Sequence, residues 1–193
     1  MSDPQVQADK RANDRNTSLS RRPSGAGGED FDRAVAAHHE RIRLLVYRLL
    51  GWRDGIEDVV QDVFLAAWAG WARFRGRSSV ELWLKRIAVN KCRSRLRREA
   101  VRGRWLGWMR GVFNNQTQAP ADQLLEKQEQ AERVRLAIRR LEPVYREATV
   151  LYYLEQLNID QIAEIIGVRR NTVEVRLHRA RRQLEKILAD MME

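Results

Sequence analysis

The sequence predicts an all-α fold of two small helical domains joined by a linker, the second of them a helix-turn-helix domain. Apolar residues recur every three or four positions in successive segments, as they do on the buried face of amphipathic helices. Two of these segments meet at Gly167, where a tight turn between helices is expected. The length of 193 residues and the hydrophobic content of 44% suffice for two small cores, which we place in residues 29–99 and 129–193.

Two stretches of the chain lie outside these predicted domains. Residues 1–28 are polar and end in a glycine-rich run, so we expect a disordered N-terminal extension. Residues 100–128 form the expected linker. Its part from 101 to 121 is richer in arginine and tryptophan than a plain tether needs, and it is compatible with a short amphipathic helix that packs on a domain or on a partner.

The first domain is predicted to begin with two helices. Apolar residues recur at helical spacing in residues 31–49, and Gly51 ends this segment. A second apolar stripe runs over residues 56–71, after a break in the pattern. The histidines His38 and His39 are interpreted as ordinary helix residues and not as ligands or catalytic groups.

The second predicted helix opens with acidic side chains, among them Asp58 and Asp62. Carboxylates near a helix N-terminus are stabilised by the helix dipole, so capping explains them without any partner. The alternative is a docking face for a basic partner, because Gln61 and Asp62 stand beside apolar residues. The residues alone leave both explanations open.

A strongly basic segment follows, with 13 basic and two acidic residues between Arg73 and Arg110. Four polar side chains recur along one face of its predicted helix: Arg86, Asn90, Arg93 and Arg97. This stripe is long enough to follow a nucleic-acid backbone. The loop before it offers Trp71 and Phe74 to unstacked bases, although burial in the core is the simpler explanation for these two rings.

The C-terminal segment has the features of a helix-turn-helix. Asn158 can cap a first helix together with Gln161, and Gly167 can take the left-handed conformation that ends it. The second helix separates a buried stripe from a free face, which comprises Asn171, Glu174, Val175, His178 and Arg182. Flanking arginines are Arg170, Arg176, Arg179 and Arg181. Such a helix suits a major groove with arginines on the phosphates, while a solvated charged face is the plain alternative.

The overall charge favours a nucleic-acid partner. The chain has 36 Lys and Arg against 26 Asp and Glu, a net charge of +10 and a pI near 10.5. Only five of these 36 residues are lysines, and arginine favours bidentate contacts to phosphate or guanine. A GC-rich genome would enrich arginine as well, with no functional cause.

Several classes of function lack support in the sequence. Cys92 is the single cysteine, no His/Cys group has metal-ligand spacing and no glycine-rich phosphate loop is present. We therefore expect no catalytic residues, no metal and no cofactor. No apolar run approaches the eighteen or so residues of a membrane span, so no integral membrane segment is expected.

Six segments of the chain resemble a known family, the extracytoplasmic-function (ECF) sigma factors of bacterial RNA polymerase. In chain order they are DVVQDVFLAAW at 58–68, FRGRSS at 74–79, WLKRIAVN at 83–90, YRE at 145–147, IAEIIGV at 162–168 and TVEVRLHRAR at 172–181. The resemblance covers about residues 31–98 and 131–188. It implies an alternative sigma factor that binds core RNA polymerase, at the beta-prime clamp and beta subunits, and directs promoter-specific transcription initiation.

The resemblance also assigns roles to individual residues. The set implied to bind core polymerase is Asp58, Gln61, Asp62, Phe64 and Trp68. The set implied to contact the minus-10 element is Phe74, Arg75, Ser78, Trp83, Arg86, Asn90, Arg93 and Arg97. The set implied to read the minus-35 element is Arg170, Asn171, Thr172, Glu174, Val175, Arg176, His178, Arg179 and Arg182. The chain departs from the family at Arg169–Arg170, where a helix cap is common, and at Glu174–Val175.

The resemblance further implies a cytoplasmic protein with an anti-sigma partner, which could hold it at the membrane. Two other functions remain open on the residues. One is a stand-alone DNA-binding regulator that uses only the helix-turn-helix. The other is a helical scaffold bound through its acidic face.

Overall fold

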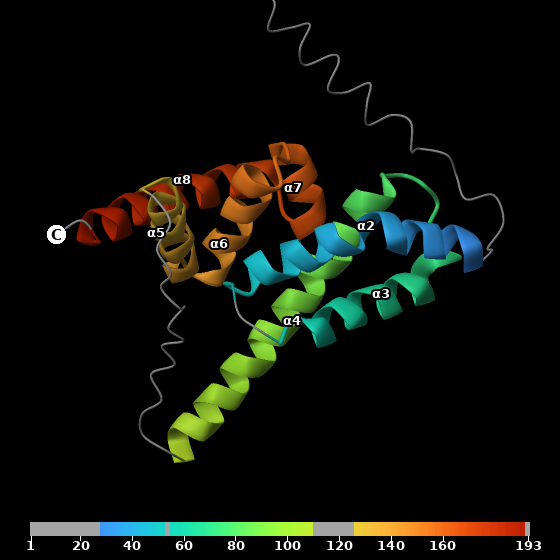
Figure 1. Ribbon diagram of the computed structural model, residues 1–193, viewed down its shortest axis with the longest axis horizontal. Helices are drawn as coiled ribbons and strands as arrows, with labels where there is room; N and C mark the ends of the chain where they lie inside the picture. The colour runs from blue at the N-terminus through green and yellow to red at the C-terminus, as the bar shows by residue number, and fades with distance from the viewer. Residues whose placement is uncertain (1–27, 53–54, 110–125, 192–193) are drawn as a thin grey trace, which may run out of the picture.

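A computed structural model describes residues 28–52, 55–109 and 126–191, and all regular secondary structure in these ranges is helical (Figure 1). The all-α fold is thus confirmed. The elements are α2 (Gly28–Leu49), α3 (Glu57–Trp71), α4 (Val80–Met109), α5 (Glu126–Arg140), α6 (Pro143–Thr149), the π-helical turn η2 (Val150–Leu154), α7 (Ile159–Ile166) and α8 (Arg170–Asp190).

The first domain consists of α2, α3 and the first half of α4, which pack on one another around an apolar core. The periodic apolar residues expected for two helices supply this core, with Leu45, Val63 and Leu84 almost fully buried. Gly51 has a φ of +81°, the left-handed conformation that ends α2. The three helices place the acidic start of α3 and the basic face of α4 in one domain.

Helix α4 is longer than the sequence pattern indicated. It continues through the first ten residues of the expected linker to Met109, and Figure 1 shows its last turns extending away from the other helices. The remainder of the basic, aromatic stretch falls in 110–125, outside the described residues. The expected disordered extension also falls outside them, apart from Gly28, with which α2 begins.

The second domain contains the predicted helix-turn-helix in α7 and α8. The Asn158 side chain accepts from the Gln161 backbone, and the Gln161 side chain accepts in return from the Asn158 backbone, so the capping box is present. Gly167 has a φ of +69° and ends α7. Arg169 stands before α8 without a side-chain cap, as expected from its type. Val173, Leu177 and Ala180 bury one face of α8 and leave the opposite face in solvent.

The two domains lie against each other. Helix α4 packs along α7, α2 contacts α6 and η2, and one continuous cluster of buried residues includes members of both domains. Within the described ranges, no helix combines the length and the apolar character that crossing a bilayer requires.

Candidate polymerase-binding and DNA-binding surfaces

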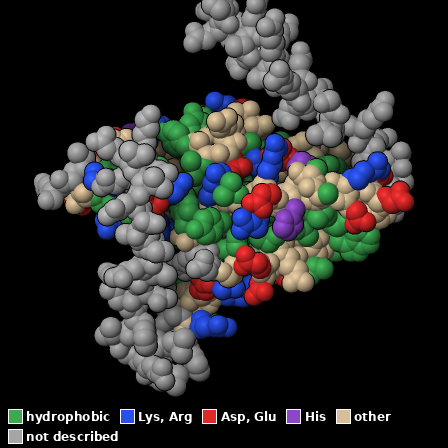
Figure 2. All heavy atoms as spheres, viewed as in Figure 1, with side chains coloured by type: hydrophobic (Ala, Val, Ile, Leu, Met, Phe, Trp, Pro, Cys, Tyr) green, Lys and Arg blue, Asp and Glu red, His purple; other side chains and the backbone are tan. Residues whose placement is uncertain are grey.

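The outer face of α3 combines acidic and apolar side chains in solvent. Asp58 and Gln61 are exposed at its start, and Trp68 is 55% exposed near its end. Leu65, between them, is 58% exposed. Figure 2 shows hydrophobic side chains at the surface over α3, at the lower right of the view. Large apolar side chains gathered on one helix face indicate an interaction surface more strongly than scattered ones do.

Two further residues of the set implied to bind core polymerase, Asp62 and Phe64, are partly covered by the first domain. Phe64 stacks on His39 of α2, with ring centroids 5.4 Å apart, and Asp62 lines a shallow hollow between α3 and α4 that also contains Asn90. Leu65 was not among the predicted residues. Its position beside Asp62 and Trp68 on one helix face was the available signal.

The loop before α4 is anchored by an aromatic cluster. The ring centroid of Phe74 lies 4.9 Å from that of Trp83 and 5.9 Å from that of Trp71, and Trp71 is only 7% exposed. Burial in the core therefore explains the Trp71 ring without any contact to bases. Phe74 and Trp83 are half-buried at the edge of the aromatic cluster. Arg75 is exposed next to Gly76, which has a φ of +65°, and Ser78 is half-buried. The cluster fixes the base of a loop that presents arginine to solvent.

The polar stripe on α4 is divided between solvent and the second domain. Arg86, Asn90 and Arg97 are exposed, whereas Arg93 contacts Glu147 of α6. The Arg93 guanidinium donates to both carboxylate oxygens of Glu147 at 2.6 and 2.8 Å, and its third bond, at 3.0 Å, goes to the carbonyl of Ile166. Glu147 is 6% exposed. In this arrangement Arg93 therefore contacts the second domain of the chain itself, while the other three members of the stripe face solvent.

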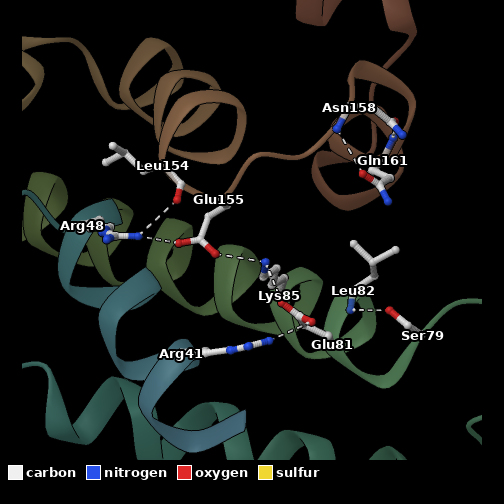
Figure 3. A network of polar contacts seen from close by, with 10 residues as sticks. All are labelled: Arg41, Arg48, Ser79, Glu81, Leu82, Lys85, Leu154, Glu155, Asn158 and Gln161. Atoms are coloured by element: carbon white, nitrogen blue, oxygen red, sulfur yellow. Dashed lines mark hydrogen bonds and ion pairs between the residues drawn. The ribbon is translucent and has the colours of Figure 1, made fainter. Parts of the chain in front are cut away.

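A second group of ion pairs joins the domains around Glu155, which follows η2 (Figure 3). Its carboxylate accepts from Arg48 of α2 at 2.9 Å and pairs with Lys85 of α4 at 3.0 Å. Lys85 also pairs with Glu81 at 2.9 Å, and its side chain is 4% exposed. Burial raises the pKa of Glu81, but the hydrogen-bonded ion pair with Lys85 and the nearby charge of Arg41 together lower it more, so the pKa lies below its ordinary value.

The recognition helix α8 carries most of its predicted contact residues in solvent. Exposed members of that set are Arg170, Asn171, Glu174, Val175, His178, Arg179 and Arg182. Thr172 and Arg176 are half-buried, and Arg176 lies 3.8 Å from Glu147. Arg170 is paired with Asp160 of α7 and with Glu174. The described residues contain no cluster of three or more His, Cys, Asp or Glu suited to a metal ion.

Both domains match family models in the expected order. The model of Sigma-70 region 2 covers residues 34–102, and the model of Sigma-70 region 4 covers residues 131–184. The chain is 30% identical over 173 residues to the ECF RNA polymerase sigma factor SigW of Bacillus subtilis, covering 86% of this chain and 92% of that protein. The chain belongs to the ECF RNA polymerase sigma factors.

Other relatives agree with this assignment. The ECF RNA polymerase sigma factor SigM of Mycobacterium tuberculosis is 30% identical over 158 residues, covering 82% of this chain and 76% of that protein. Among solved structures, the sigma factor RpoE in complex with the anti-sigma factor NepR, from Bartonella quintana, is similar with a TM-score of 0.67 and 28% identity. This match covers 83% of this chain and 98% of that one. The match to both regions favours a sigma factor over a stand-alone regulator.

Proposed function

We propose that this sigma factor binds core RNA polymerase through the outer face of α3. The observation that carries the proposal is the exposed pair Leu65 and Trp68 beside Asp58, on a helix of the region 2 domain. Apolar side chains supply area to an interface, while carboxylates steer a basic partner surface and fix the register. Capping of α3 by its acidic residues does not account for the exposed apolar side chains of Leu65 and Trp68.

The basic surfaces of the two domains would then read the promoter at two places. The loop with Arg75, set on the aromatic cluster, would hold unpaired bases of the minus-10 element, and the exposed Arg86, Asn90 and Arg97 would follow the adjoining backbone. Helix α8 would enter the major groove of the minus-35 element. We assign no catalytic step to the chain, because polymerase performs the chemistry.

Reading both elements requires the domains to separate. The elements are centred about 25 base pairs apart, which is roughly 85 Å of duplex at ~3.4 Å per base pair. A compact chain of this length has a radius of gyration of only about 16 Å. Opening breaks the contacts of Glu155 and releases Arg93 from Glu147, so that Arg93 can join the polar stripe on α4 at the DNA backbone.

Regulation by a protein partner fits the packed arrangement. A partner that binds both domains would hold them together. RpoE of Bartonella quintana, which this chain resembles, was crystallised in complex with the anti-sigma factor NepR. We propose an anti-sigma partner for this chain as well, with action in the cytoplasm where polymerase transcribes. An anti-sigma partner anchored in the membrane would hold the chain at the membrane surface.

Charge reversal on α3 tests the proposed docking face. Replacing Asp58 and Asp62 by Lys should weaken binding to core polymerase in a titration, since like charges would then face each other. The matched control reverses two exposed acidic residues elsewhere, Asp32 and Glu164, and should bind core as the wild type does. Circular dichroism should show that both variants stay folded. Equal core affinity of the two variants would remove the α3 face from the interface.

A further inference from the structure

The first turn of α8 contains an arginine that two carboxylates hold in place. Arg170 donates from Nε to Glu174 at 3.0 Å, and from Nη1 to the two Asp160 oxygens at 2.9 and 2.8 Å. Glu174 lies one turn further along α8, whereas Asp160 lies in the first turn of α7. The guanidinium is thus fixed across the turn of the helix-turn-helix, from both helices.

Neither stability nor phosphate binding explains this arrangement. The side chains of Arg170, Asp160 and Glu174 are 55%, 71% and 45% exposed, and ion pairs so exposed contribute little to folding. Together the three groups carry a net charge of −1, since two carboxylates surround one guanidinium. Such a group is repelled by a phosphate, so Arg170 is poorly suited to backbone contact, in contrast to Arg179 on the same helix.

The remaining donors of Arg170 suit a base edge. Among the described residues, Nη2 makes no hydrogen bond, and Nη1 has a second N–H beyond the one its pairing with Asp160 requires. Guanine presents two acceptors, O6 and N7, side by side in the major groove, and an arginine fork satisfies both. The N-terminal residues of a recognition helix are those that reach base edges in helix-turn-helix proteins.

We propose that Arg170 reads a guanine in the minus-35 element, and that Asp160 and Glu174 are positioning residues that hold its guanidinium in the required orientation. This rests on the proposed function, in which α8 enters the promoter duplex. In this proposal Glu174 contributes to minus-35 recognition through Arg170, from which its carboxylate accepts, and not by contacting a base itself. Holding a long, flexible side chain in one orientation before binding reduces the entropy lost at the interface.

Selection of promoter sequences by the holoenzyme tests the proposal. Core polymerase with the full chain selects from a DNA library randomised over the minus-35 element, and bound sequences are counted. The wild type should prefer guanine at one base pair, and Arg170→Lys should lose this preference while keeping its charge. Asp160→Asn and Glu174→Gln should each reduce the guanine preference at that base pair about tenfold, the scale of one bidentate contact, and leave the other positions unchanged.

The control is Glu164→Gln, which removes one charge from an exposed residue of α7 that has no ion pair among the described residues. It should select the wild-type sequence. If Asp160→Asn and Glu174→Gln raised the affinity for every DNA sequence alike, the carboxylates would act only by repelling DNA phosphates, and the proposal would be wrong. A wild-type guanine preference that survived both substitutions would also overturn it. A wild-type holoenzyme with no minus-35 preference would overturn the proposed function and this inference with it.

Discussion

The ion pairs between the domains and those at the start of α8 use the same kinds of side chain in different surroundings. Between the domains, Glu147 and Glu155 are largely shielded from water, and the cations nearest to them come from the other domain. On α8, the partners of Arg170 stand in solvent. Removing one partner of a buried pair leaves a poorly solvated charge, whereas an exposed partner is solvated again at once. We therefore infer that the first set determines domain arrangement and the second determines side-chain orientation.

The largest effect is expected for Glu155→Ala. This change removes the acceptor shared by Arg48 and Lys85, and Lys85 would keep only Glu81 as an acidic partner. The cost is about 3 kcal/mol of unfolding free energy, as for other broken buried pairs. In scanning calorimetry the single transition expected for packed domains should separate into two. The exposed Glu185→Ala is the control, and an unchanged transition in Glu155→Ala would contradict the account.

A smaller effect is expected for Glu147→Gln, which keeps the shape of the side chain and weakens two charge-assisted bonds from Arg93. Because the Arg93 side chain is 32% exposed, water compensates in part, and roughly 1–2 kcal/mol should be lost. If packing of the domains competes with core binding, this destabilised variant should bind core polymerase more tightly than the wild type. Weaker core binding would indicate that the packed arrangement assists polymerase binding.

A dependence on pH is expected from His38, which is 8% exposed beside the Glu155 network. Burial lowers its pKa below the ordinary 6.5; Glu81 opposes this shift, while Arg41 and Lys85 add to it. The unfolded chain therefore binds the proton more readily, and stability should fall as pH decreases from about 7 through 6.5 towards the folded pKa. The melting temperature of His38→Asn should therefore change less with pH in this window than that of the wild type. A wild-type melting temperature that is constant there would contradict the shift.

The smallest effect on stability is expected for Asp160→Asn combined with Glu174→Gln. Both carboxylates are exposed, so the melting temperature should stay at the wild-type value although promoter selection changes. A clear fall in melting temperature would give this pair a structural role. The comparison between buried and exposed pairs would then lose its basis.

Local features of the fold could be predicted from the sequence because each depends on neighbouring residues. The capping box of Asn158 with Gln161 and the turn at Gly167 follow from residue type and spacing alone. The apolar stripes likewise indicated which helix faces are buried. A short helix within 101–121 was among the expectations, but its unbroken continuation from α4 to Met109 was not predicted, because glycines and tryptophans obscure the helical pattern there.

The contacts between the domains could not be predicted in the same way. Arg93 and Glu147 are 54 positions apart, and the spacing of Arg93 on α4 is equally that of a DNA contact. Glu147 stood in a matched motif with no role assigned to it. Arg170 and Asp160 are only ten positions apart, yet their pairing depends on the angle between α7 and α8, which the sequence pattern does not specify.

The central claim, that the packed domains separate when the chain acts at a promoter, is tested most directly by an intramolecular distance. Cysteines introduced at the exposed Leu44 of α2 and Gln130 of α5, which line one hollow between the domains, can carry a fluorophore pair. Cys92 will not compete for label, since it is 3% exposed and burial raises its pKa to about 12. We expect efficient energy transfer in the free chain, and its loss when core polymerase and a selected promoter are added. Equal transfer efficiency in the two states would contradict the claim.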